Sequence, residues 1–318
     1  MLSLPDFIEK KILVVPIEEK LESQLKLQVG NIVLMKEGKV IDKVSCHIVF
    51  CMVIIGDCSI TTKLIRELQS YGISVFLLNR SFKFITSIHA HAEGNYQLRE
   101  KQYFLDKDTE LLLSKQFVQN KIDNQWGILQ KTGRLDLEQA YRDTTEKVTL
   151  ANSIDSLRGL EGSFASRYFS GIFDEIGWLR RAPRTKEDIA NVLLDIGYTF
   201  VFNYVDALLR LFGFDTYKGV YHQLFFQRQS LSCDLMEPMR PMIDYQLRKS
   251  FNLGQIQEKD FVFKNESFRF KDYSVSGSYS NIWFDLIMKK REDMYQFIFG
   301  YYRCFQNPEK YEYAQFKV

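Results

Sequence analysis

Two acids and a histidine in the carboxyl-terminal half of the chain could together hold a metal ion. Asp234 and Glu237 are three residues apart, so a helix would place both carboxylates on one face. His222 precedes them closely enough for its segment to fold back onto that face. With a third acid from elsewhere, these side chains would form a mixed nitrogen and oxygen pocket. Such a pocket suits Mg²⁺ or Mn²⁺ better than zinc.

Pro238 directly follows Glu237 and weakens the simple helical argument. The residue before a proline resists the α conformation, so either a helix kinks here or Glu237 ends one segment and Pro238 begins the next. Both alternatives keep the two acids near each other. A lone histidine among aromatic residues is often a buried core side chain, but the two acids favour His222 as a ligand.

Glu161 is a further candidate acid, because it lies among small residues in the stretch 156–171. Gly159 and Gly162 interrupt an otherwise helical pattern there, and each costs roughly 1 kcal/mol relative to alanine. Two such glycines indicate close approach of another backbone or room for a ligand. A loop capped by glycines is the alternative, and the sequence leaves both interpretations open.

Local groups of basic residues could contact phosphates. The net charge of the chain is only +2, so a nucleic-acid surface would have to be a local patch. A solvated loop, or pairing with nearby acids such as Asp244, is the alternative for these groups. If they bind DNA, they hold its backbone with little sequence readout, and binding weakens with salt. The candidate DNA-binding residues are Arg180, Arg181, Arg184, Lys186, Arg240, Arg248, Lys289 and Lys290.

Length and composition are those of an ordinary globular protein. The 318 residues are 46% hydrophobic and 26% charged, which allows one large or two ordinary domains. The five cysteines are odd in number and lack CxxC spacing, so they indicate reduced thiols and no zinc site. The start of the chain lacks a signal-peptide pattern, and the apolar run Ile196–Val205 is about half a membrane span. We therefore expect a cytoplasmic location without membrane contact.

The first ninety residues predict a small β-rich domain with one inserted helix. Asn31–Lys36 and Val40–Val44 flank a Glu-Gly-Lys turn and predict a hairpin. Ile48–Ile55 is continuously apolar, as in a strand that is buried on both faces. A capping hydroxyl within residues 59–62 predicts a helix that runs to about Tyr71. Further strands are predicted at Lys11–Pro16, Ile73–Leu78 and Lys83–Ile88.

His89 and His91 have the spacing of two metal ligands on one face of a strand. No third ligand is visible near them in the sequence. We therefore favour a polar strand end over a metal site.

From Asn95 onward the pattern becomes helical, and Gly94 is the expected hinge between two domains. The fold class is therefore α+β, with a small N-terminal β-rich domain at residues 1–92 and a larger C-terminal all-α catalytic domain at residues 93–318. Helices are predicted over Tyr96–Gln130, Asp136–Ser156, Asp188–Phe212 and Ile282–Phe305, with short strands within Phe251–Ser280 and a loose tail at Asn307–Val318.

Several fragments taken in order resemble the CRISPR-associated adaptation integrase and endonuclease family, the Cas-one family. Any one fragment is weak evidence, but their order covers nearly the whole chain. The amino half contributes the strand that ends at Gly56 and the segment Gly94-Asn95 with Arg99, Gln102 and Tyr103. The carboxyl half contributes Glu161-Gly with Ala165-x-Arg167-Tyr-Phe, Asp188-x-x-Asn191-x-x-Leu194, Gly213-Phe214-Asp215, Gly219-x-x-His222 and Ser230-Leu-x-x-Asp234-Leu-Met-Glu237-Pro-x-Arg240-Pro.

The resemblance implies a specific activity and site. Members of this family pair as homodimers and insert short double-stranded DNA fragments into the CRISPR array by transesterification. They usually act with a small ferredoxin-like partner protein. Each helical domain holds Mn²⁺ or Mg²⁺, and the matching ligands here are Glu161, His222 and Glu237. Asp234 matches a nearby acid that supports the site or joins it, so the implied catalytic residues are these four.

Two other functions remain open on the sequence. One is a non-catalytic DNA-binding scaffold in which the acids form a structural cluster. The other is a plain metal-dependent nuclease that trims DNA ends without joining them.

Overall fold

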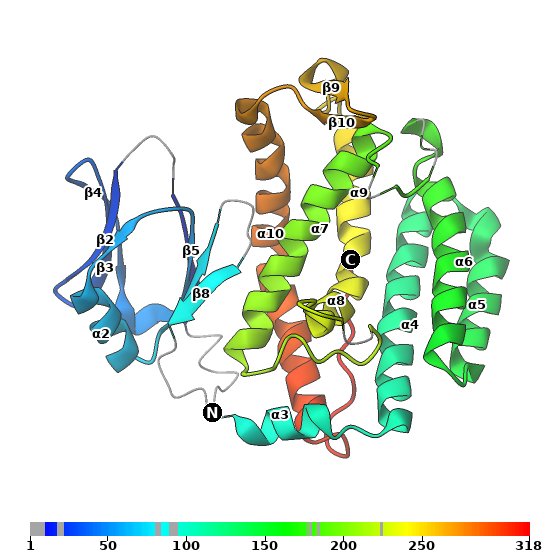
Figure 1. Cartoon of the computed structure of the whole chain (residues 1–318), viewed down its shortest axis with the longest axis horizontal. Helices are drawn as coiled ribbons and strands as arrows, with labels where there is room; N and C mark the ends of the chain where they lie inside the picture. Colours follow the sequence, from blue (N-terminus) through cyan, green and yellow to red (C-terminus); the bar gives the residue numbers. More distant parts are fainter. Residues whose placement is uncertain are drawn as a thin grey trace. The chain divides into compact units, whose positions relative to one another are not determined.

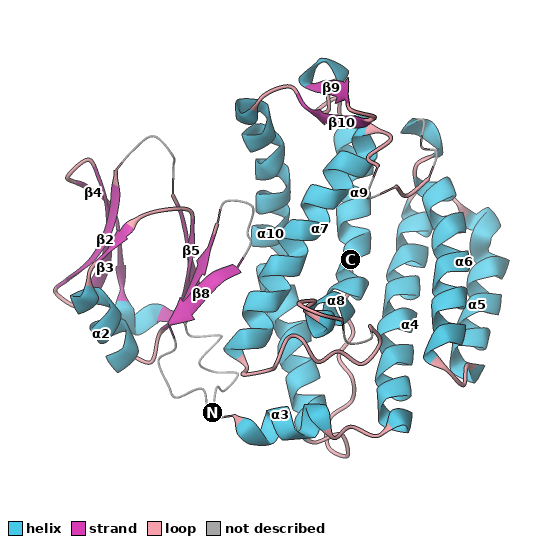
Figure 2. Ribbon diagram, viewed as in Figure 1, coloured by secondary structure: helices cyan, strands magenta, loops and turns pink. Residues whose placement is uncertain are grey.

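The computed structural model describes residues 10–17, 22–79, 84–88, 95–176, 178, 180–182, 185–222 and 225–318. The chain divides into two compact units, Met1–Asn95 and Tyr96–Val318. The expected boundary between residues 92 and 93, the hinge at Gly94 and the pair His89 and His91 lie outside the described residues. Strands gather in the first unit and helices in the second (Figure 2), which confirms the α+β class.

One sheet of the first unit has the strand order β1–β5–β7–β8. Cys51 and Met52, which point to opposite faces of β5, are 2% and 0% exposed, so this strand is buried on both faces as predicted. Strand β5 has a parallel neighbour on each side, and a continuous apolar sequence is typical of such a strand. The strands are β1 (Lys11–Pro16), β5 (Val49–Ile55), β7 (Ser74–Leu78) and β8 (Phe84–Ile88), of which β8 is antiparallel to β7.

A second sheet of the first unit has the order β4–β3–β2–β6. The predicted hairpin between β3 and β4 turns at Glu37 and Gly38, whose φ angles of 48° and 76° suit a tight hairpin turn. Strand β2 was not predicted from the sequence. A helix, α2, follows β6 and is capped by the Thr61 side chain, which accepts from the Leu64 backbone N–H. These elements are β2 (Ser23–Gln28), β3 (Asn31–Lys36), β4 (Lys39–Ser45), β6 (Ser59–Ile60) and α2 (Thr62–Ser70).

The second unit begins with two helices where one was predicted. The Asp106 side chain accepts from the Thr109 backbone N–H at 2.8 Å and starts a new helix, because an N-cap aspartate satisfies the free N–H groups of a first turn. Figure 1 shows α4, α5 and α6 packed side by side. The helices are α3 (Tyr96–Tyr103), α4 (Lys107–Lys131), α5 (Glu138–Leu150) and α6 (Ile154–Ile172), with short 3-10 turns η2 (Leu135–Leu137) and η3 (Asp174–Ile176).

The apolar helix α7 (Ile189–Leu211) is the core of the second unit. Asp188 caps its start and Gly213, with φ of 86°, follows its end, as predicted. By length and hydropathy α7 could span a membrane, but 78% of its most apolar window is buried inside the unit, which is typical of a core helix. A Cβ on Gly197 would meet Ile243 at 2.5 Å and Trp283 at 3.2 Å, so α7 packs closely against the helices α9 (Arg240–Asn252) and α10 (Tyr273–Gln306).

The remaining elements lead to the C-terminal helix. Short strands were predicted within Phe251–Ser280 and are present as the hairpin β9–β10, but α10 starts well before the predicted Ile282. These elements are α8 (Ser230–Met236), η4 (Glu237–Met239), α9 (Arg240–Asn252), η5 (Glu258–Asp260), β9 (Phe261–Lys264), β10 (Ser267–Phe270) and α10 (Tyr273–Gln306).

The prediction of a loose tail at Asn307–Val318 is wrong, because Phe316 in this tail is bound to α4. Phe316 is 1% exposed. Its backbone N–H donates to the Asn120 side chain at 2.9 Å, and its carbonyl accepts from Asn120 and Asn124 at 2.9 and 2.8 Å. Buried polar side chains on a helix supplied these partners, and the local sequence of the tail does not show them.

Candidate active site

Two of the three sequence-predicted acids and the histidine share one cavity of about 460 Å³ in the second unit. Glu161, His222 and Glu237 all line it. The other lining residues come from α4, α6, α7, α9 and the loop that precedes α7; they are Lys121, Gln125, Gly162, Ala165, Ser166, Phe169, Ser170, Trp178, Arg180, Arg181, Tyr198, Arg240 and Asp244.

Glu161 is carried by an uninterrupted helix and not by a loop. The Ser153 side chain caps α6 by accepting from the Ser156 backbone N–H, and the helix continues to Ile172. A Cβ on Gly159 or Gly162 would meet nothing within 4 Å, so neither glycine is there for close backbone approach. Gly162 borders the cavity, which agrees with the interpretation that it leaves room beside Glu161.

Both oxygens of Glu161 are engaged. Its Oε2 accepts from the Tyr221 hydroxyl at 2.6 Å, and its Oε1 is in direct contact with the Lys121 ammonium. The side chain of Glu161 is 20% exposed, so it faces the cavity from a half-buried position.

Glu237 begins η4 and is 4% exposed. Its Oε2 lies 2.6 Å from Lys121 Nζ, and its Oε1 accepts from Arg240 Nε at 2.9 Å. Burial would raise the pKa of Glu237, but Arg240, Lys121 and His222 outweigh burial and lower the pKa to about 2. Glu237 is therefore a carboxylate at neutral pH.

Asp234 lies behind His222 and holds the loop that carries it. The Asp234 carboxylate accepts from the backbone N–H groups of Val220, Tyr221 and His222 at 2.7, 3.1 and 2.9 Å, and from His222 Nδ1 at 2.6 Å. Asp234 is 0% exposed. A Cβ on Gly219 would come within 2.7 Å of Asp234 Oδ2, so the close approach of this loop requires glycine.

The expectation that Asp234 and Glu237 point at one place is wrong. Asp234 is turned toward the loop at residues 220–222, whereas Glu237 is turned toward Lys121 on α4. Helix α8 ends at Met236, and Pro238 lies in the first turn of η4, so Glu237 starts a new segment. Asp234 acts on the site through the orientation of His222.

The donor set suits a hard or borderline divalent ion in kind. Two carboxylates converge on one point, and a histidine whose Nδ1 is bound by a buried carboxylate keeps Nε2 for a ligand position. Among the described residues, no three His, Cys, Asp or Glu side chains converge closely enough to hold a metal as they stand. The point on which Glu161 and Glu237 converge is taken by the Lys121 ammonium.

Sequence reasoning missed Lys121, which belongs to a polar stripe on α4. Asn120, Lys121, Asn124 and Gln125 are all buried, and their spacing places them on one side of the helix. The charge pattern of the predicted helix favours a solvated face, which does not hold for the buried Lys121. The amide pair Asn124-Gln125, one turn after Lys121, was the available signal for a buried polar face.

Three arginines border the cavity, and only one of them is largely exposed. Arg180 is 72% exposed and pairs with Glu187. Arg181 donates to Asn191 at 2.8 Å and contacts Asp195, so its guanidinium is already bound by side chains of the second unit. Arg240 pairs with Glu237 and lies over the ring of Tyr198 at 4.7 Å.

Lys186 and Arg248, two other predicted DNA-binding residues, make contacts within the second unit. Arg184 is outside the described residues. Lys186 is held through its backbone, which donates to Ala182 and accepts from Phe268. Arg248 is 9% exposed, and its guanidinium donates to the Ile172 carbonyl and pairs with Glu175. The prediction that Arg248 contacts DNA does not fit this burial.

Lys289 and Lys290 line a separate cavity of about 350 Å³ together with Lys131 and Lys249. We call these four residues the lysine cluster. Tyr245 lies among them, 4.9 Å from the Lys249 ammonium. On α9, Tyr245 and Lys249 are on the face opposite Arg240 and Asp244, by the helical period.

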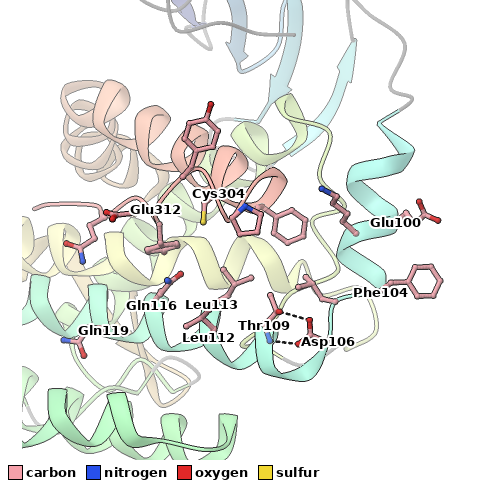
Figure 3. A pocket seen from close by; sticks show the side chains of 17 residues that line it. Glu100, Phe104, Asp106, Thr109, Leu112, Leu113, Gln116, Gln119, Cys304 and Glu312 are labelled. Carbon is pink, nitrogen blue, oxygen red and sulfur yellow. Dashed lines mark hydrogen bonds between the residues drawn. The ribbon is translucent and has the colours of Figure 1, made fainter.

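A larger cavity, of about 920 Å³, lies away from these groups between α3, the start of α4 and the end of α10 (Figure 3). Its lining includes the acids Glu100, Asp106 and Glu312, and apolar side chains such as Phe104 and Leu112. Carboxylates at this position would repel a phosphate backbone. The chemistry is therefore assigned to the smaller cavity.

Fold and site together define a two-part protein in which a strand-rich unit accompanies a helical unit with a carboxylate and histidine site. The family model described as CRISPR associated protein Cas1 matches residues 19–277. A relative from Thermodesulfovibrio yellowstonii, the CRISPR-associated endonuclease Cas1 1, is 31% identical over 234 residues, which are 68% of this chain and 73% of the relative. The chain belongs to the Cas1 family.

Solved structures agree with this assignment. A chain of a partial Cas6-RT-Cas1–Cas2 complex superposes with a TM-score of 0.79 at 25% identity, over 97% of this chain and 98% of that chain. A casposase bound to its integration product shares the fold, with a TM-score of 0.71 at 18% identity, over 97% of this chain and 99% of that chain.

Proposed function

We propose that this chain is a metal-dependent DNA integrase and endonuclease of CRISPR adaptation. In this proposal it joins the 3′-hydroxyl of a short DNA fragment to the CRISPR repeat by transesterification. The observation that carries the proposal is the convergence of Glu161 and Glu237 on one cation position, in a cavity that His222 also lines. The name of the 31% identical relative, an endonuclease, supports the same reaction class.

Glu161, Glu237 and His222 would hold Mn²⁺ or Mg²⁺. When bound, the ion supplies positive charge that lowers the pKa of the attacking hydroxyl and stabilises charge on the phosphate. Asp234 fixes the ring of His222 through Nδ1 and so keeps Nε2 available. Arg240 keeps Glu237 ionised and borders the cavity, where it can contact a phosphate oxygen. One phosphodiester is exchanged for another, so no high-energy cofactor is needed.

Two basic surfaces would hold double-stranded DNA. Arg180 lies at the cavity, and its exposed ion pair with Glu187 can exchange for a phosphate at little cost. The lysine cluster lies on the other face of α9 and presents ammonium groups around an aromatic ring. It could hold a second stretch of backbone outside the reacting site.

We further propose a homodimer that works with a small ferredoxin-like adaptation protein in the cytoplasm. The matching structure of a complex that contains Cas1 and Cas2 supports a protein partner. All five cysteines are free thiols, as suits a reducing compartment.

The test is strand transfer of a labelled DNA duplex into a supercoiled plasmid that carries a CRISPR repeat, with Mn²⁺ or with EDTA. Glu161→Gln should abolish joined products while DNA binding persists. Glu138→Gln, on the exposed surface of α5, is the matched control and should join DNA normally.

The products separate the three candidate functions. Joined half-site products with Mn²⁺ support the integrase, and nicks alone support a plain nuclease. Salt-sensitive binding that does not respond to EDTA, without any products, supports the scaffold. Full joining by Glu161→Gln would show that the reaction uses another site.

A further inference from the structure

Lys121 occupies the point at which a divalent ion would bind. Its ammonium is in contact with Glu161 Oε1 and lies 2.6 Å from Glu237 Oε2. The side chain of Lys121 is only 10% exposed. Contact with two carboxylates favours the charged form of the lysine, so the group is a cation.

The helix that carries Lys121 is fixed in place. Asn120 and Asn124 on either side of it bind the backbone of Phe316. Trp126, one turn further along, stacks on Tyr141 at 5.2 Å. The backbone at Lys121 is therefore unable to shift far, whereas its four-carbon side chain can rotate into the adjoining cavity of about 460 Å³.

Charges around the pair balance in this structure. The carboxylates of Glu161 and Glu237 are matched by the cations of Lys121 and Arg240. A divalent ion on the same two oxygens would place its charge next to an ammonium in a partly buried site, where repulsion is only weakly screened. The divalent ion and the Lys121 ammonium therefore cannot bind the same carboxylate oxygens at the same time.

We propose that Lys121 is a resident counter-cation of the Glu161–Glu237 pair and that a divalent ion must displace its ammonium to bind. This inference rests on the proposed function, because it concerns the same ion. The displaced ammonium moves into the cavity, where it can contact a phosphate of the DNA. Lys121 thus lowers the affinity of the protein for the ion alone, and its release links ion binding to DNA binding.

The experiment measures Mn²⁺ binding to the full chain without DNA, from the electron paramagnetic resonance signal of free Mn²⁺. Lys121→Met removes the competing cation and should tighten Mn²⁺ binding by at least about fivefold, the lower end of typical coupling between two ligands. The same variant should have a lower melting temperature without Mn²⁺ and regain it when Mn²⁺ is added. Lys115→Met, on the same helix, is the matched control, because the Lys115 ammonium binds only the Thr149 carbonyl among the contacts described.

Lys121→Arg keeps the positive charge and tests the inference if Lys121→Met does not fold. Its Mn²⁺ affinity should stay at or below that of the unmodified chain. Equal or weaker binding by Lys121→Met, or at least fivefold tighter binding by Lys121→Arg, overturns the inference. If strand transfer still depends on Glu161 in that case, the proposed function stands. If neither the unmodified chain nor Lys121→Met binds Mn²⁺, with or without duplex DNA, both the inference and the proposed function fail.

Discussion

Replacing Asp234 with asparagine should destabilise the chain strongly, because its carboxylate accepts four hydrogen bonds. Oδ2 accepts from the N–H groups of Val220 and Tyr221, and Oδ1 accepts from the backbone N–H and Nδ1 of His222. An asparagine amide has one oxygen and one NH₂ group. Whichever way it is turned, the NH₂ group replaces an acceptor of two hydrogen bonds.

The expected loss follows from these two bonds. Each hydrogen bond to a charged group contributes about 1.5–3 kcal/mol, so Asp234→Asn should lower the free energy of unfolding by about 3–6 kcal/mol. The loss arises in the loop that carries His222, so the variant should also join DNA poorly even where it is folded.

Urea unfolding followed by tryptophan fluorescence measures the loss. Asp155→Asn is the matched control, because that side chain is 85% exposed in a surface ion pair and should change stability by less than about 1 kcal/mol. If Asp234→Asn were no less stable than this control, the assignment of Asp234 as the anchor of the His222 loop would be refuted.

Three further predictions concern other parts of the second unit. Gly197→Ala should destabilise the chain by about 1–3 kcal/mol, because its Cβ would meet Ile243 at 2.5 Å. Gly277→Ala on α10 should stabilise the chain slightly, because its Cβ would meet nothing within 4 Å, and thermal unfolding of both variants tests the two expectations. Lys249→Ala should weaken binding of random duplex DNA and lower the slope of log affinity against log salt by about 1, and an unchanged slope would exclude a phosphate contact there. Burial raises the pKa of Asp244 to about 6, so the folded state binds the carboxyl proton more tightly than the unfolded state does, and the free energy of unfolding should fall as pH rises from about 4 to about 6. In Asp244→Asn this contribution to the pH dependence should be absent when unfolding by urea is measured across the same pH range.

The sequence was sufficient for elements with strong local signals. The apolar run of β5 and the capped apolar helix α7 were predicted nearly to the residue, since burial on all sides leaves a continuous apolar pattern. Strand β2, with the sequence SQLKLQ, was missed because four of its six residues are polar. The break between α3 and α4 was missed because one side chain, Asp106, decides it.

The sequence identified residues of the candidate site, but it did not show the directions in which their side chains point. Glu161, His222 and Glu237 do line one cavity. The orientation of Asp234 depends on a loop that packs onto it from twelve to fourteen residues earlier, and helical spacing alone carries no information about that loop. Lys121 lies forty residues from Glu161, so only tertiary packing brings the two together.

The anchoring of Phe316 also affects how truncations should be interpreted. Deletion of the final few residues of the chain would leave the buried amides of Asn120 and Asn124 without their backbone partners, on the helix that positions Lys121. A shortened preparation could therefore lose activity although every acid and histidine of the cavity is intact.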